Sequence, residues 1–306
     1  MATLEVHAVG PLAMLEDKGR PGLAAIGVPP SGAVDRVSLA QGNRLLGNPD
    51  KAAGIEVLLG GLAVSVDETI VFVVTGAPCP LSIDGRPVGF GAALPLRPGQ
   101  VLRLGVPVAA LRSYLVVRGG LLASSDTRHF GSSSSDPTSG LGPAPLAAGD
   151  RIEVGAVVAG NPRYDLEVPP VGSSGGELDL HATLGPRDDW LTPESVEVLG
   201  AAAWEVTAEG DRVGVRLAGP ALSSGGPEQL PSEGIVRGAV QVPPSGQPVV
   251  FLADHPTTGG YPVVAVMDDA DTDRLAQLRP GERLRLHLRR ARWLEHDRTR
   301  ASAGMP

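Results

Sequence analysis

Lysine is almost absent from this sequence: only Lys18 and Lys51 occur, although arginine is plentiful. Neither lysine follows a glycine, so the chain has no GxxxxGK[ST] phosphate-binding loop. Neither lysine stands beside a methionine, as a biotin-carrying lysine typically does. The usual nucleotide-binding and biotin-attachment signatures are therefore missing.

Other absences narrow the class of protein. The single cysteine, Cys79, cannot form a disulfide within the chain, and the first residues do not resemble a signal peptide. No apolar run reaches the ~18 residues that suggest a membrane span. The formal charge of −8 and the sequence pI of about 5.3 disfavour a nucleic-acid partner, because such proteins usually carry a basic face. We expect a cytoplasmic protein with a small-molecule or protein partner and no membrane contact.

Glycine and proline are abundant, with 41 and 29 residues, which disfavours long helices and favours short strands joined by turns. Helices are expected from the cap Asp35 to Gly47, from Thr192 to Gly200 and, shorter, in DTDRLAQL. Short apolar or alternating runs predict strands at 4–9, 54–59, 69–75, 101–104, 113–117, 151–154, 178–184, 247–253 and 282–288. The predicted fold class is mostly β.

Two passages recur along the chain. LRPGQVLRL at 96–104 returns as LRPGERLRL at 278–286, and LEVHAVGP near the start is echoed by LDLHATLGP. Such self-similarity favours two related β domains in tandem, with equivalent strands after each LRPG, although a shared Pro-Gly turn is the simpler alternative. The predicted division is 1–167 for the first domain, 168–177 for a Pro/Gly/Ser-rich linker, 178–290 for the second domain and 291–306 for a tail.

The first half contains two polar clusters. In LEDKGRPGLAAIGVPPSGAVD, glycines would let backbone N–H groups approach a ligand held by Asp17, Arg20, Ser31 and Asp35. The alternative is a series of turns, with Asp35 only as a helix cap. The loop GSSSSDPTSGLG is either a flexible surface connection, which its composition favours, or a nest of donors for an anion.

The second half carries more candidate chemistry. Arg212 and Arg216 would share one face of a strand and could hold a carboxylate or phosphate, although a surface ion pair is an equal alternative. In ADHPTTGGYP, Asp254 and His255 could form an acid/base pair, with Glu233 as a third catalytic candidate. The predicted binding residues around them are Gln241, Thr257, Thr258, Gly259, Gly260 and Tyr261. The remaining candidates, His7, His129, His181 and His287, have no acidic or cysteine neighbours at metal-ligand spacing, so no metal site is expected.

These motifs in order, EDKGRPG, GVPPSGAVD, GNRLLGN, GSSSSDP, DRVGVRL, SEGIVRGAVQVPPSGQP and LADHPTTGGYP, resemble the allophanate hydrolase subunit 2 family, also called the kinase-inhibitor-antagonist family. The family includes the C subunit of bacterial 5-oxoprolinase and a carboxyltransferase segment of urea carboxylase. The resemblance covers about 4–288. It implies two cyclophilin-like β-barrel domains and a partner, a subunit 1 homologue, in a heterodimer or heterotetramer.

The implied activity is that of one component of an ATP-dependent amide hydrolase, which opens 5-oxoproline or cleaves allophanate. ATP is the implied cofactor, with the partner subunit as a candidate for its binding site. The alternatives are a carboxyltransferase that uses carboxybiotin supplied from elsewhere, and a regulator that sequesters an inhibitor of a histidine kinase. The resemblance places the candidate site residues named above in matching motifs and proves no role for them.

This chain departs from the family pattern at several places. Glu16 stands where members often have Gln, and Pro256 where they often have another Gln. Ser133 and Ser135 replace an Arg and a Thr of the serine-rich loop. The missing loop arginine puts phosphate handling by that loop in doubt.

Overall fold

The computed structural model describes residues 1–124, 126–163, 176–223, 225 and 230–290. The chain divides into two compact units, Met1–Ser174 with Ala276–Leu278, and Gly175–Leu275 with Arg279–Pro306. Most of the predicted linker and all of the predicted tail lie outside the described residues. Each unit is described by itself.

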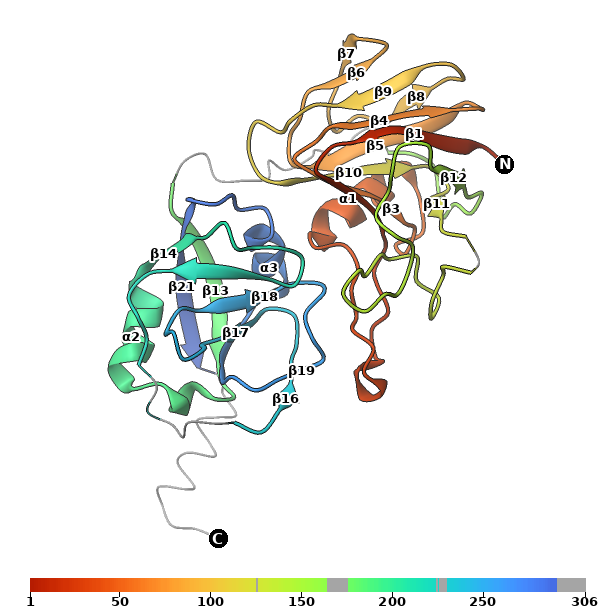
Figure 1. Cartoon of the computed structure of the whole chain (residues 1–306). Helices are drawn as coiled ribbons and strands as arrows, with labels where there is room; N and C mark the ends of the chain where they lie inside the picture. Colours follow the sequence, from red (N-terminus) through yellow and green to blue (C-terminus); the bar gives the residue numbers. More distant parts are fainter. Residues whose placement is uncertain (125, 164–175, 224, 226–229, 291–306) are drawn as a thin grey trace. The chain divides into compact units, whose positions relative to one another are not determined.

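The first unit is built from two antiparallel sheets (Figure 1). One sheet has the order β11 (Leu121–Leu122), β12 (Arg151–Val154), β1 (Thr3–Val9), β4 (Leu62–Val66), β9 (Val101–Leu104), β6 (Leu81–Ile83) and β7 (Arg86–Val88). The other has the order β2 (Leu12–Glu16), β3 (Gly54–Leu58), β10 (Arg112–Val117), β5 (Ile70–Gly76) and β8 (Leu94–Leu96). The short 3-10 turn η1 (Ala24–Ile26) lies in the loop after β2.

The central strand β10 is buried on both faces. On one face, Leu115 lies opposite Ile55 of β3 and Val74 of β5, and all three belong to the core that both sheets share. On the other face, Val116 packs in a smaller cluster with helix α1 (Arg36–Leu46). Coverage on both sides explains why the end of the strand is an apolar run rather than a strict alternation.

The second unit is a closed barrel with the order β13 (Leu178–Leu184), β20 (Val263–Met267), β17 (Ala239–Gln241), β18 (Val249–Phe251), β15 (Gly214–Ala218), β14 (Ala203–Val206) and β21 (Arg283–Arg290). Leu180 and Leu286 face each other across the parallel pair of β13 and β21, and both are fully buried. The other elements are η2 (Asp188–Trp190), α2 (Pro193–Ala201), α3 (Asp269–Leu275) and the small sheet of β16 (Glu233–Gly234) with β19 (Thr258–Gly259). The mostly β fold predicted from the sequence is confirmed.

The repeated LRPG motif is a repeated turn. In each copy the side chain that follows the glycine accepts a hydrogen bond from the arginine backbone N–H: Arg97 N to Gln100 Oε1 at 2.9 Å, and Arg279 N to Glu282 Oε2 at 2.6 Å. The strands that follow have different neighbours, because β9 pairs with β4 and β6 whereas β21 pairs directly with β13. The expectation of equivalent strands is therefore wrong, and the shared turn accounts for this match.

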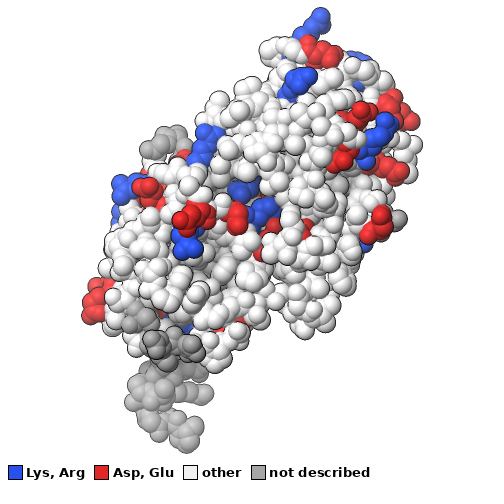
Figure 2. Space-filling model, in the orientation of Figure 1, with Lys and Arg blue, Asp and Glu red and all other residues white. Residues whose placement is uncertain are grey.

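No helix within the described ranges is long and apolar enough to cross a membrane. On the face shown in Figure 2, basic and acidic side chains are interspersed rather than gathered by sign. This face has no basic stripe of the kind that tracks a nucleic-acid backbone.

Candidate functional site

The carboxylate of Asp17 is the centre around which the serine-rich loop is ordered. Asp17 directly follows β2, and its Oδ1 accepts hydrogen bonds from Ser132 Oγ and Ser134 Oγ, both at 2.7 Å. Its Oδ2 accepts a hydrogen bond from the backbone N–H of Ser133 at 2.7 Å. Residues 132–136 are buried, whereas residues 137–140 are exposed, so the expectation of a flexible surface loop is wrong for the serine run. The loop is a nest of donors, and the anion that it holds is the protein's own aspartate.

The loop between β2 and α1 folds back on itself beside the serines. The backbone N–H of Arg20 donates to Pro30 O at 2.7 Å, and Ser31 Oγ donates to Ser135 O at 3.2 Å. A Cβ on Gly19 would lie 2.2 Å from Pro30 O, so only glycine permits this approach. The structure thus brings Asp17, Arg20 and Ser31 together.

Asp35 is the N-cap of α1 and lies in a buried polar network. Its Oδ1 accepts from the Ser38 backbone N–H at 2.9 Å, and its Oδ2 accepts from Ser38 Oγ at 2.6 Å and from Gln277 Nε2 at 2.7 Å. Burial raises the pKa of Asp35 above its usual range, and these hydrogen bonds oppose that rise. The contacts of Asp35 within this unit are those of a structural cap.

Three members of this network carried no signal of their own in the sequence. Tyr114 and Glu56 are direct cross-strand partners on β10 and β3, and the tyrosine hydroxyl donates to Glu56 Oε2 at 2.8 Å. Burial, followed by the charges of Glu56 and Asp35, raises the pKa of Tyr114 well above its usual value, so the phenol stays protonated. Gln277 comes from the short segment Ala276–Leu278, far away in sequence but part of this unit.

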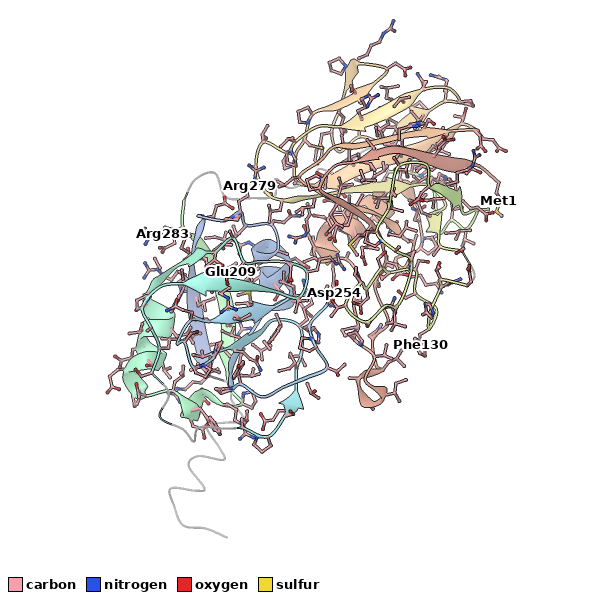
Figure 3. The ribbon with its side chains drawn as sticks, in the orientation of Figure 1. Met1, Phe130, Glu209, Asp254, Arg279 and Arg283 are labelled. Atoms are coloured by element: carbon pink, nitrogen blue, oxygen red, sulfur yellow. The ribbon has the colours of Figure 1, made fainter. Side chains whose placement is uncertain are left out.

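In the second unit, Arg212 and Asp254 form a buried ion pair. Arg212 Nε lies 2.7 Å from Asp254 Oδ2, and Nη2 lies 3.2 Å from Oδ1, which is a bidentate arrangement. Antiparallel pairing of β15 with β18 sets this geometry, because the chain continues from β18 through Leu252 to Asp254 (Figure 3). Arg216 pairs instead with Glu209 at 2.9 Å, so each arginine has its own carboxylate partner in the fold.

His255 is buried next to this pair, with only 3% of its surface exposed. Its Nδ1 lies 2.9 Å from Pro256 O. A carbonyl oxygen can only accept, so Nδ1 carries the hydrogen and neutral His255 has its acceptor at Nε2.

Strand pairing and hydrogen bonds connect the rest of ADHPTTGGYP to the segment 233–241. Gly234 pairs with Thr258 in the small sheet, and the backbone N–H of Ile235 donates to Thr257 O at 3.0 Å. Gln241 Nε2 donates to Tyr261 O at 2.8 Å. The predicted residues of these two segments are brought together by their backbones.

The side chains in this loop face different surroundings. Gly259 packs against the Gln241 side chain, since a Cβ there would lie 3.0 Å from Nε2. Thr258 and Gly260 are exposed, and 49% of the Tyr261 surface is exposed. The loop therefore combines a buried beginning with an open end.

Glu233 has a partner that the sequence did not indicate. Arg187 Nε lies 3.0 Å from Glu233 Oε1, and Arg187 Nη2 also contacts that oxygen. The hydrogen bond from Arg187 holds the pKa of Glu233 below its usual range. Glu233 is thus suited to an electrostatic role in its ionised form and poorly suited to donate a proton near neutral pH.

Among the described residues, no group of three or more histidine, cysteine, aspartate or glutamate side chains could hold a metal ion. The candidate chemistry of the second unit rests on one histidine nitrogen, ionised carboxylates and their arginine partners. Such a set can move a proton and orient a polar substrate.

Comparison with known proteins assigns this architecture to a family. The family model "Carboxyltransferase domain, subdomain A and B" matches residues 26–288. The chain is also 33% identical over 282 residues to the C subunit of 5-oxoprolinase from Escherichia coli, covering 91% of this chain and 89% of that protein. The chain belongs to the carboxyltransferase domain family.

Solved structures of other proteins contain the same fold. Urea amidolyase of Kluyveromyces lactis matches with a TM-score of 0.86 at 25% identity over 93% of this chain, which spans 18% of that protein. TTHA0988 matches with a TM-score of 0.82 at 31% identity over 94% of this chain and 56% of its own. Members of the carboxyltransferase domain family thus occur as segments of much longer proteins.

Proposed function

We propose that this chain is one component of an ATP-dependent amide hydrolase of the 5-oxoprolinase type, acting with a subunit 1 homologue. The observation that carries the proposal is the nearly end-to-end match to the C subunit of 5-oxoprolinase, which covers 91% of this chain and 89% of that protein. By contrast, the chain spans only 18% of the urea amidolyase. The mutual coverage therefore favours the comparison with the C subunit over the comparison with the urea amidolyase.

The residues of the second unit suggest how the chain would contribute. His255 would accept a proton at Nε2 from the nucleophile or the amide, because Nδ1 is committed to a carbonyl. Asp254, engaged by Arg212, would act as a positioning residue for the histidine that follows it. Glu233, ionised beside Arg187, would stabilise positive charge in the reacting groups.

ATP would supply the driving force by activating a carbonyl oxygen. We place its binding site on the partner, because this sequence has no phosphate-binding loop. Gln241 and the Thr257–Tyr261 region, with its glycine amides, would bind the substrate.

The test is co-expression with the subunit 1 homologue and any third subunit, followed by ATP turnover with 5-oxoproline, allophanate or urea. Stimulation by one amide identifies the substrate. His255→Gln should lower turnover by about 10²-fold or more if the imidazole transfers a proton. His7→Gln is the matched control, because His7 is an exposed histidine of the first unit that contacts Ser65 Oγ. Full activity of assembled His255→Gln enzyme would contradict the proposed role.

Carboxyl transfer from carboxybiotin is a second candidate, favoured by the TM-score of 0.86 to urea amidolyase and by the family itself. It would need a biotin carrier and a biotin carboxylase from other proteins. Decarboxylation of carboxybiotin stimulated by urea, without any amide-dependent ATP turnover by the assembled complex, would favour this alternative.

A further inference from the structure

Both lysines of the chain line one pocket of the first unit. The pocket has a volume of about 340 Å³, and its wall is formed by the segment Asp17–Pro21 together with Leu23, Lys51, Phe130 and Gly131. In an acidic protein with only two lysines, their presence at one hollow concentrates a large share of its ammonium charge. This positive charge favours a negatively charged ligand.

The two carboxylates close to this pocket offset only part of the charge of Lys18, Arg20 and Lys51. Asp17 keeps its negative charge, and its oxygens are occupied by hydrogen bonds from the serine loop and from the backbone N–H of Gly19 at 2.7 Å. Asp50 pairs with Lys18 at 3.0 Å, in an exposed contact that contributes little. Lys51 has no ion pair within the described part of the chain.

Arg20 adds a second, independent observation. The residue belongs to the pocket lining and is only 2% exposed, and its Nη2 donates to Ser134 O. The other two nitrogens, Nε and Nη1, have no hydrogen-bond partner among the described residues. No ion pair holds this guanidinium within the described part of the chain, so its positive charge lies behind the pocket surface, where solvent screens it weakly.

The rest of the wall indicates what kind of molecule fits. Phe130 (Figure 3), Leu23 and Pro21 offer apolar surface beside the ammonium groups. Phe130 is held at φ 51° and leaves 56% of its surface exposed. A hollow with one apolar side and one cationic side suits a small molecule with an anionic group and a compact apolar body.

We propose that this pocket binds a small anion through Lys18 and Lys51, with Arg20 supplying charge from behind, and that the ligand is a carboxylate or a phosphate. The site does not depend on the hydrolase proposal, because it belongs to the first unit and its test measures binding rather than turnover. In the test, 5-oxoproline represents the carboxylates and inorganic phosphate represents the phosphoryl group.

The scarcity of lysine provides the experiment. Reductive methylation with ¹³C-formaldehyde labels only Lys18, Lys51 and the amino terminus of the full chain, and it retains their charge. Their NMR signals, assigned with Lys18→Arg and Lys51→Arg, are followed during titration with 5-oxoproline, inorganic phosphate and the neutral lactam 2-pyrrolidinone. Ionic strength is held constant at about 0.1 M, so that general screening does not change.

We expect saturable shifts of both lysine signals with at least one anion, none with the lactam, and a stationary amino-terminal signal. Lys51→Gln should weaken binding by about fivefold or more, whereas the matched control Arg86→Gln, an exposed cation outside this pocket, should not. Preference for 5-oxoproline identifies the carboxylate, and preference for phosphate identifies the phosphoryl group.

Three results would overturn the proposal: shifts that do not saturate, shifts that appear equally at the amino terminus, and shifts that are unchanged in Lys51→Gln. Absence of any shift with both anions would do the same. If the assembled complex turns over no amide but these shifts occur, the hydrolase proposal fails and the anion site stands.

Discussion

Breaking the buried ion pair between Arg212 and Asp254 should destabilise the protein far more than breaking an exposed one. The two side chains are 8% and 2% exposed and form a bidentate contact, with Nε to Oδ2 at 2.7 Å. Removing one partner of such a pair typically costs 3–5 kcal/mol, because the remaining charge loses its partner away from water. Arg212→Met and Asp254→Asn should each cost about 3 kcal/mol or more.

The two substitutions should not be additive. Once one charge is gone, removing the other relieves a penalty, so the double variant should be more stable than the sum predicts by about 1–3 kcal/mol. Urea unfolding of the full chain, followed by circular dichroism, measures these differences. With an m value of about 2 kcal/mol/M, each single variant should lower the midpoint by roughly 1.5–2.5 M.

Arg216 and Glu209 provide the control in the same part of the barrel. Their ion pair at 2.9 Å is 43% and 73% exposed, so its loss should cost at most about 1 kcal/mol. The reasoning is refuted if the Arg212 and Asp254 variants are no less stable than the control variants, or if their effects simply add.

Three further outcomes are expected. In urea unfolding, Gly19→Ala should lower the free energy of unfolding by about 1–3 kcal/mol more than Gly22→Ala does. Both glycines have positive φ, but an added Cβ would lie 2.2 Å from a carbonyl oxygen at Gly19 and would meet nothing within 4 Å at Gly22. Gln277→Ala, which removes buried hydrogen bonds, should lower the free energy of unfolding by about 2–4 kcal/mol. Gln100→Ala, which removes an exposed hydrogen bond of a turn, should lower it by about 1 kcal/mol or less, and equal losses would contradict the buried network. The pKa of Asp35 is higher in the folded than in the unfolded protein. The stabilisation that Asp35 provides is therefore complete below its unfolded pKa and is lost as pH rises through its folded pKa. The melting temperature of the wild type minus that of Asp35→Asn should therefore fall as pH rises above about 4, and a flat difference would refute the raised pKa.

Short stretches of sequence predicted much of the local structure, such as helix ends and turns. Asp35 and Gly47 were predicted to bound a helix, and α1 runs between them with Asp35 capping Ser38 N and Gly47 in the left-handed conformation. The LRPG motif forms the same turn twice, which was the alternative to the predicted pair of equivalent strands. These features depend on contacts within a few residues, where backbone sterics and side-chain caps suffice.

The candidate site could be predicted only in part. ADHPTTGGYP was identified by its density of polar groups, and the structure does bring it against the segment that contains Glu233 and Gln241. The sequence did not indicate Arg187 as the partner of Glu233. It also suggested that Arg212 and Arg216 would act together, whereas each has a separate acidic partner.

By itself, the sequence determined the mostly β class, the caps, the turns and which stretches are rich in polar groups, because each follows from neighbouring residues. Only the tertiary structure decided the pairings: Asp17 with the serine loop, Tyr114 with Glu56, and Gln277 with Asp35 across 242 positions. It also placed Lys18 and Lys51 at one pocket. The physical reason is that strand register and chain closure choose partners far apart in sequence, and a buried polar group carries no mark of the partner that will satisfy it.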